Sequence, residues 1–164
     1  MLPVACLVRS FGSRVEPSLS LFFTGSSLPR DSVNLSKATK LKAARFWCTE
    51  LRVEWITMAL RTITPNHRNL RQIFIGIPYA LSRHGVGANI RQTLGETIYE
   101  RWLDLDHLFI QLWESNSIRP GVRYSCTSES EKKETVDCVS CLLPEATKRG
   151  IVDLVKHAGV GIPM

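Results

Sequence analysis

The sequence predicts an α/β fold in which about three parallel strands lie side by side, with helices on one side of the sheet and a helical cap at the C-terminal end. Two observations predict it. The first is a repeated pattern of one apolar residue, two spacers, a second apolar residue, one spacer and a third apolar residue. The second is helical spacing of the apolar residues between copies of that pattern, because a strand, a helix and a strand in succession make a parallel pair. The three copies are Leu41, Ala44 and Phe46, then Leu70, Ile73 and Ile75, then Leu105, Leu108 and Ile110.

The distance between copies indicates the kind of stack. A period of roughly 20–29 residues is typical of leucine-rich repeats, in which each unit adds one strand to the sheet. The step from Leu41 to Leu70 is at the upper end of that range, and the step from Leu70 to Leu105 exceeds it. The extra length of the second step falls in a loop rich in glycine and proline that follows Ile75. We therefore expect a short stack of leucine-rich-repeat-like units.

The composition agrees with a single folded domain. Of the 164 residues, 44% are hydrophobic and 22% are charged, which is near the average for globular proteins and unlike disordered or collagen-like chains. No apolar run approaches the roughly 18 residues of a membrane-spanning helix, so we expect no membrane partner. The repeat-like domain is predicted at 41–158. Residues 1–40, which are rich in serine, are predicted to be a disordered or peripheral tail, and 159–164 a second tail.

The first unit reads as a strand followed closely by a helix. Ala44–Cys48 has the apolar and aromatic character of a strand, and Thr49 is a candidate N-cap for a helix over Glu50–Ile63. Apolar residues in that helix recur at steps of three, four and three residues, which gives one apolar face. They are Val53, Ile56, Leu60 and Ile63.

The second unit repeats this order. The turn-rich segment Pro65–Asn69 ends the first helix, and Leu70–Ile75 reads as the second strand. Asn89 then caps a second helix, in which every fourth residue is apolar. These residues are Ile90, Leu94, Ile98 and Trp102.

The third copy of the pattern fits two structures. Leu105–Trp113 could continue the helix from Trp102, but the repeat register and the alternation of apolar residues favour a third strand. Alternation at Val122, Tyr124 and Cys126 predicts a short last strand. The polar segment Thr127–Asp137 is then predicted to be a surface loop, and Glu145–His157 the closing helix.

Several short segments carry a family resemblance: Arg61–Leu70, Trp102–Asp106, Gln111–Ser115, Ser117–Pro120, Leu142–Glu145 and Arg149–Ile151. Together they resemble the C-terminal part of the uncharacterised F-box and leucine-rich-repeat-like proteins of fungi, over roughly residues 40–158. In that family an N-terminal F-box would recruit a ubiquitin ligase, and the repeats would hold a substrate. Residues 1–40 do not look like F-box helices. The resemblance therefore implies a substrate-recognition fragment without its F-box.

Charge is distributed unevenly along the chain. Residues 1–91 carry 13 Lys and Arg against 4 Asp and Glu, whereas residues 92–164 carry 8 against 11. A basic half can attract nucleic acid or acidic protein surfaces. The basic residues are scattered, however, and no base-stacking motif accompanies them. We keep nucleic-acid binding as an alternative and favour a solvated surface.

Five cysteines at positions 6, 48, 126, 138 and 141 do not form the even, regular framework of a secreted disulfide-rich domain, so we expect an intracellular protein, cytoplasmic or nuclear. Cysteine and histidine also offer one alternative chemistry. Cys138 and Cys141 have zinc-ligand spacing, and Cys126 with His157 could complete a tetrahedral set, either structural or catalytic. No second Cys-x-x-Cys is present. We therefore expect no cofactor, and favour buried cysteines on a helix turn.

Asp104, Asp106 and His107 are a second candidate group, because a carboxylate beside an imidazole can serve in acid–base catalysis. On the expected strand, however, the two aspartates share one face and His107 takes the other. A solvated edge of the repeat is the simpler interpretation. We expect no enzymatic activity.

The predicted function is protein binding by the strand side of the stack. Alternation places a set of arginine, glutamine and aromatic side chains on that side across three strands, which suits an acidic, partly apolar peptide or loop of an unknown partner protein. The candidate binding residues are Arg45, Trp47, Arg71 (with Gln72 as an alternative), Phe74, Phe109, Gln111 and Trp113.

Overall fold

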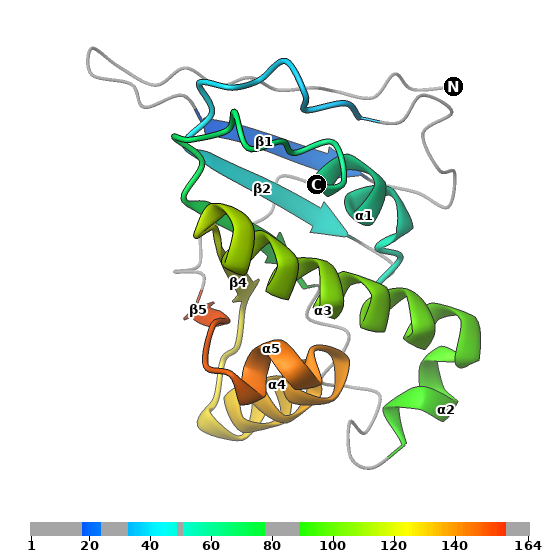
Figure 1. Cartoon of the computed structure of the whole chain (residues 1–164). Helices are drawn as coiled ribbons and strands as arrows, with labels where there is room; N and C mark the ends of the chain where they lie inside the picture. The colour runs from blue at the N-terminus through cyan, green and yellow to red at the C-terminus, as the bar shows by residue number, and fades with distance from the viewer. Residues whose placement is uncertain (1–17, 24–32, 49–50, 78–88, 157–164) are drawn as a thin grey trace.

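A computed structural model describes residues 18–23, 33–48, 51–77 and 89–156, with the side chains of 18–23 and 48 left out (Figure 1). Five described strands form one sheet in the order β1-β2-β3-β4-β5, and every neighbouring pair is parallel. The predicted α/β class and parallel sheet are confirmed, with five strands where about three were expected. The strands are Ser18–Phe23 (β1), Ala43–Cys48 (β2), Gln72–Gly76 (β3), Arg119–Tyr124 (β4) and Asp153–Lys156 (β5).

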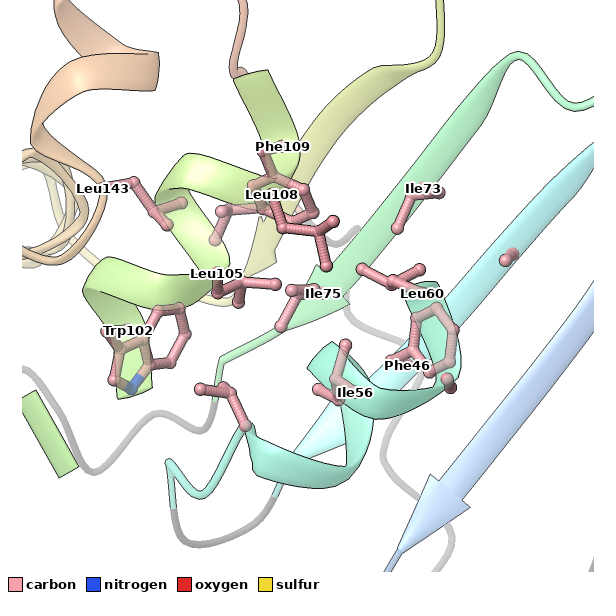
Figure 2. Packing of buried hydrophobic residues seen from close by; sticks show 14 of the residues in the cluster. Phe46, Ile56, Leu60, Ile73, Ile75, Trp102, Leu105, Leu108, Phe109 and Leu143 are labelled. Atoms are coloured by element: carbon pink, nitrogen blue, oxygen red, sulfur yellow. The ribbon is translucent and has the colours of Figure 1, made fainter. Parts of the chain in front are cut away.

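Helices connect the strands and supply one wall of the core. α3 packs against α1, α4, α5 and β4, and α2 packs against the start of α3. Figure 2 shows the resulting core between the sheet and helices α1 and α3, with Phe46, Ile73 and Ile75 contributed by the sheet. The helices are Glu54–Leu60 (α1), Ile90–Leu94 (α2), Glu96–Asn116 (α3), Glu129–Leu142 (α4) and Pro144–Lys148 (α5).

The first two copies of the sequence pattern form equivalent repeats. Ala44 pairs with Ile73 and Phe46 with Ile75, which is the register that the pattern predicts, and all four side chains are fully buried. The turns that lead into β2 and β3 also contain equivalent backbone hydrogen bonds. The amides of Ala38 and Leu41 donate to the carbonyls of Leu35 and Ala38, and one repeat later the amides of His67 and Leu70 donate to those of Thr64 and His67.

The two turns are joined by side chains. Leu35 is 2% exposed, and its backbone amide donates to Thr62 Oγ1 at 2.7 Å while its carbonyl accepts from His67 Nε2 at 2.8 Å. His67 Nδ1 accepts from the Thr64 amide at 3.0 Å, which leaves Nε2 as the ring nitrogen that donates to the Leu35 carbonyl. The side chains of Thr62 and His67, which lie between β2 and β3, therefore hydrogen-bond to the backbone of the turn that precedes β2.

The third copy of the pattern is helical, so the prediction of a strand at Leu105–Trp113 is wrong. This segment lies inside α3, and the next strand is β4, in which Arg119 pairs with Gln72. Its alternation arises because α3 is buried on two sides. Leu108 and Leu112 belong to the main core, whereas Ile110 packs with Ala146 and Ile151 in a second apolar cluster. The apolar residues of the two buried faces of α3, taken together, therefore alternate along the sequence as they would in a strand.

Residues 1–40 are not wholly peripheral, contrary to expectation. Ser18–Phe23 forms β1 and pairs along its whole length with β2. Leu35 is part of the core, with Val33 and Ala38 packed against it. Ser18 pairs with Ala43, which lies 25 residues further along the chain (43 minus 18). Ala43 pairs in turn with Gln72, which lies 29 residues further along (72 minus 43), so the two spacings are similar. The parallel sheet therefore begins before the first copy of the sequence pattern.

The C-terminal expectations are corrected in two places. Most of the predicted loop Thr127–Asp137 is helix α4, which begins with Ser128 Oγ accepting from the Glu131 amide at 3.2 Å. The predicted helix Glu145–His157 stops early, because Gly150 adopts a φ of +67°, a left-handed conformation that favours glycine and ends helices. The chain then continues as β5, and His157 lies outside the described residues.

Boundaries of the first two helices also shift. α1 is shorter than the predicted Glu50–Ile63 and has Val53 as its N-cap, while Thr49 lies outside the described residues. Asn89 precedes α2 as predicted, although no hydrogen bond from its side chain caps the helix. Gly95, at a φ of +80°, separates α2 from α3 where one continuous helix was expected.

β4 contains Pro120 without losing a sheet hydrogen bond. The Arg119 amide donates to the residue before β3 and the Arg123 carbonyl accepts from the residue after β3, so the odd-numbered residues of β4 bond to β3. Pro120 therefore turns its nitrogen toward β5. That strand begins at Asp153, which pairs with Gly121, so Pro120 precedes the residues that pair with β5 and does not interrupt that ladder.

Candidate binding face

The candidate site lies on the face of the sheet opposite the helical core, which we call the strand face. Ala44 and Phe46 point into the core, so Arg45 and Trp47 point to the other face of β2. The same alternation places Phe74 of β3 and Arg123 of β4 on that face, beside neighbours in the strand that are buried. We call these four residues, Arg45, Trp47, Phe74 and Arg123, the arginine–aromatic cluster.

Two glycines leave room for aromatic rings from the neighbouring strands. Trp47 is paired with Gly76, and a Cβ atom at that glycine would overlap the indole ring. Phe74 is paired with Gly121, where a Cβ atom would lie 2.6 Å from Phe74 Cδ1, a distance that real Cβ atoms do not reach. Each ring therefore leans from its own strand onto the glycine of the next strand.

Arg123 completes the cluster from above. Its guanidinium carbon lies 4.5 Å from the centre of the Phe74 ring, a cation–π contact. Phe74 is consequently only 6% exposed, whereas Arg45, Trp47 and Arg123 are half-buried. Burial lowers the pKa of Arg123, and the positive charge of Arg45 lowers it further.

One ion pair lies at the edge of this face. Arg119 Nε is 3.0 Å from Asp153 Oδ2, which links the start of β4 to β5. Both side chains are well exposed, so the pair contributes little to stability. Its importance is for charge: among the described strand residues on this face Asp153 is the only acid, and it is paired with Arg119. The described strand residues on this face therefore include more arginines than acids.

The structure brings some of the predicted binding residues together and separates others. Arg45, Trp47 and Phe74 lie on adjacent strands of one face, and Arg71 is exposed just before β3. The three residues predicted on a third strand belong to α3 instead. Phe109 is 1% exposed in the core, Gln111 is exposed, and Trp113 is 36% exposed on the helix surface. The predicted ladder across three strands is wrong in this part.

Sequence reasoning missed Arg123. The signal was present, because Arg123 lies between Val122 and Tyr124 in a segment whose alternation did predict a strand. It was not recognised because the third strand was placed at Leu105–Trp113. Arg123 therefore takes the position that Phe109, Gln111 and Trp113 were expected to fill.

The candidate zinc ligands are only partly placed. Cys126 and Cys138 are buried, Cys141 is half-buried, and all three are free thiols. Burial raises the pKa of Cys138 to about 12, which keeps it protonated at neutral pH. No group of three or more His, Cys, Asp or Glu in the described ranges is arranged to hold a metal ion. His157 lies outside those ranges, so the four-residue set stays a prediction.

The candidate acid–base group divides into separate roles. Asp106 is 1% exposed, and its carboxylate accepts hydrogen bonds from the backbone amides of Glu145 and Ala146, each at 2.9 Å. It therefore caps the start of α5. Asp104 and His107 are exposed on α3, and Asp104 lies 3.6 Å from Arg101. Asp106 is thus a structural carboxylate, with both of its oxygens occupied.

Comparison with known proteins adds no family to this geometry. No family model matches the chain, and neither a curated protein nor a solved structure matches it. None of the helices in the described segments has both the length and the apolar character that crossing a membrane requires.

Proposed function

We propose that this chain is a non-enzymatic protein-binding module that contacts its partner through the strand face. The observation that carries the proposal is the arginine–aromatic cluster, which is exposed in part and faces away from the helical core. Arginine and tryptophan are among the residues most enriched in the energetically dominant contacts of protein interfaces. Trp47 and Arg123 are half-buried and already fixed by neighbours, so little side-chain entropy is lost on binding.

The architecture that we propose is a leucine-rich-repeat-like stack. Sequential parallel strands, a repeat of matching length and register shared by β2 and β3, and helices on the side opposite the strand face support it. Solenoid proteins of this kind bind partners on their extended concave surfaces. The sequence resemblance to F-box and leucine-rich-repeat-like proteins extends the proposal: the chain would be the substrate-recognition part of such a protein.

The proposal is tested by identifying a partner and then changing one tryptophan at a time. Proximity labelling with the tagged full chain supplies candidate partners, and titration of the purified pair gives the Kd. We expect Trp47→Ala to weaken binding at least tenfold. Trp113→Ala is the matched control, because Trp113 is exposed on α3, which packs on the other side of the sheet. Unchanged affinity in a folded Trp47→Ala protein would refute the proposal.

A further inference from the structure

We propose that Cys138 and Cys141, near the end of α4, are a reversible redox pair that forms an intramolecular disulfide by exchange with a small disulfide such as oxidised glutathione. This inference goes beyond the proposed function, because it concerns helix α4 and not the strand face. It assigns a chemistry to the closely spaced cysteines that partner binding does not require.

Helical spacing brings the two thiols together. Cys141 follows Cys138 by three residues within α4, so the two side chains lie on the same face of the helix, about one turn apart. Cα atoms at this spacing are about 5 Å apart, which is within the roughly 4.4–6.8 Å that a disulfide spans. Their Cβ atoms are about 5–6 Å apart, whereas a disulfide needs roughly 3.5–4.5 Å. A shift of about 1–2 Å in the last turn would therefore allow the bond.

The end of α4 is where such a shift costs least. Cys141 comes immediately before the last helical residue, Leu142, and Leu143 follows at a φ of −126° and a ψ of 62°, outside the helical region. The last carbonyl groups of a helix have no partner within it. The Cys141 carbonyl accepts from the Tyr99 hydroxyl at 3.5 Å, a long hydrogen bond that a small movement would break.

Burial sets the order in which the two thiols react. Cys138 is 1% exposed in the main core, whereas Cys141 is half-buried and packs against that core. Burial also raises the pKa of Cys138 to about 12, so its reactive thiolate form is scarce while α4 is closed. Cys141 is therefore the thiol that meets the oxidant first, and Cys138 reacts when the last turn opens.

The exchange takes place in two steps. The thiolate of Cys141 attacks one sulfur of oxidised glutathione, forms a mixed disulfide and releases one glutathione thiolate. The thiolate of Cys138 then attacks the sulfur of Cys141 and releases the second glutathione. The two cysteines lose two electrons and two protons in total, and the two glutathione molecules gain them. An excess of reduced glutathione reverses both steps.

The disulfide should loosen the start of α5. Cys138 is fixed in the core, so closing the bond draws Cys141 toward it. The chain between Cys141 and α5 is short, and the first amides of α5 are held by hydrogen bonds to Asp106. Movement of Cys141 would therefore pull on those hydrogen bonds and couple the state of the thiols to the junction between α4 and α5.

Mass spectrometry of the full chain tests the pair. The chain is equilibrated in mixtures of oxidised and reduced glutathione, quenched with acid, alkylated in denaturant and digested with trypsin. Both cysteines fall in one peptide, Glu134–Lys148, and Cys126 falls in another. As the share of oxidised glutathione rises, the first peptide should become two hydrogen atoms lighter and resist alkylation, and dithiothreitol should reverse the change. Buried Cys126 should remain a thiol throughout.

Variants separate the roles of the two thiols. In Cys138→Ser the reaction should stop at the mixed disulfide, so Cys141 should keep one glutathione. Cys138→Ala serves the same purpose if serine in the core prevents folding. In Cys141→Ser the folded chain should keep Cys138 as a free thiol. Cys126→Ser is the matched control and should form the disulfide as the native sequence does, with circular dichroism confirming that each variant is folded.

Hydrogen exchange measures the effect on α5. Amides of Pro144–Lys148 should exchange about tenfold faster in the oxidised chain and return to the original rate after reduction. Unchanged exchange would overturn the coupling to α5.

Three results would overturn the redox pair itself. The first is the absence of a disulfide within the peptide at every ratio of oxidised to reduced glutathione. The second is a disulfide that joins either cysteine to Cys126 or to another chain. The third is a rate of formation that rises with urea in step with global unfolding, because the disulfide would then belong to the unfolded chain.

Discussion

Two buried polar residues, Asp106 and His67, form hydrogen bonds with the backbone. Asp106 and His67 would both attract attention in a search for catalytic groups, yet each is almost fully buried and bonds to main-chain atoms of a neighbouring segment. Such residues are expensive to bury unless their polar atoms are satisfied. The presence of both residues is therefore accounted for by the fold.

Removing the Asp106 carboxylate should destabilise the protein. In Asp106→Ala the amides of Glu145 and Ala146 lose their acceptors at the start of α5, and we expect a loss of about 1–3 kcal/mol in the free energy of unfolding. Urea denaturation followed by circular dichroism measures it. Asp104→Ala is the control, because this exposed residue makes only a long ion pair and should change stability by less than about 0.5 kcal/mol. Equal effects from both variants would show that Asp106 is not a cap.

Cys138 should be unreactive in the folded protein and should make stability depend on pH. Burial raises its pKa from 9.0 to about 12, so between these values the unfolded chain loses the thiol proton while the folded chain keeps it. Stability contributed by this residue is therefore complete below pH 9 and declines as pH rises toward 12.

Two measurements check the Cys138 prediction. Iodoacetamide at pH 8, followed by peptide mass spectrometry, should modify Cys138 only after unfolding, and half-buried Cys141 should react sooner. In denaturation experiments from pH 8 to 10.5, Cys138→Ala should lose less stability than the native sequence. Rapid modification of Cys138 in the folded chain would contradict the assignment.

At the scale of elements, what could be predicted depended on how many sides of an element are buried. β2 and β3 each have one inward face, so Leu41, Ala44 and Phe46, and their equivalents in the next repeat, could be recognised from the pattern alone. α3 contacts the sheet on one side and α5 on another. Its apolar residues therefore have no single period, and no periodicity rule separates it from a strand.

The candidate site was predictable to the same extent. Arg45, Trp47 and Phe74 followed from alternation once β2 and β3 were placed correctly. The errors at Phe109, Gln111 and Trp113 all have one origin, the strand assigned to α3. The pairing of Gly76 with Trp47 and of Gly121 with Phe74 depends on the register between segments that are distant in the sequence. That register could not be derived for β4, because the step from β3 to β4 is much longer than the step from β2 to β3.

The connection between successive units can be tested at His67. In His67→Ala the buried carbonyl of Leu35 loses its donor, and we expect unfolding to become easier by about 1–3 kcal/mol. His107→Ala removes the same side chain from an exposed position on α3 and should change stability by less than about 0.5 kcal/mol. Thermal denaturation of both variants gives the comparison. If His67→Ala were as stable as the native chain, the side-chain link between units would be unimportant.

At the scale of the whole molecule, a sequential sheet should open from its ends. Each strand pairs only with its neighbours in the chain, so β2, β3 and β4 are bonded on both sides, whereas β1 and β5 end the order of the described sheet. Where units contact only their neighbours, stability is nearly a sum over units and their interfaces. Strand order therefore predicts a gradient of local stability.

Hydrogen exchange measures that gradient. Under native conditions the backbone amides of β3 should exchange most slowly, and those of β1 and β5 should exchange fastest among the strands. Mass spectrometry of peptides from each strand resolves the order. Equal protection in all five strands would show that the sheet opens only as one unit.

The leaning rings give the strand face a direction. Trp47 of β2 tilts onto β3 and Phe74 of β3 tilts onto β4, so both rings point the same way across the sheet. A surface made in this way is not superimposable on itself when turned end for end. A peptide crossing the strands from β2 to β4 would meet ring edges and ring faces in one order, and the same peptide reversed would meet them in the opposite order. The face would therefore distinguish the N-to-C polarity of a bound chain as well as its composition.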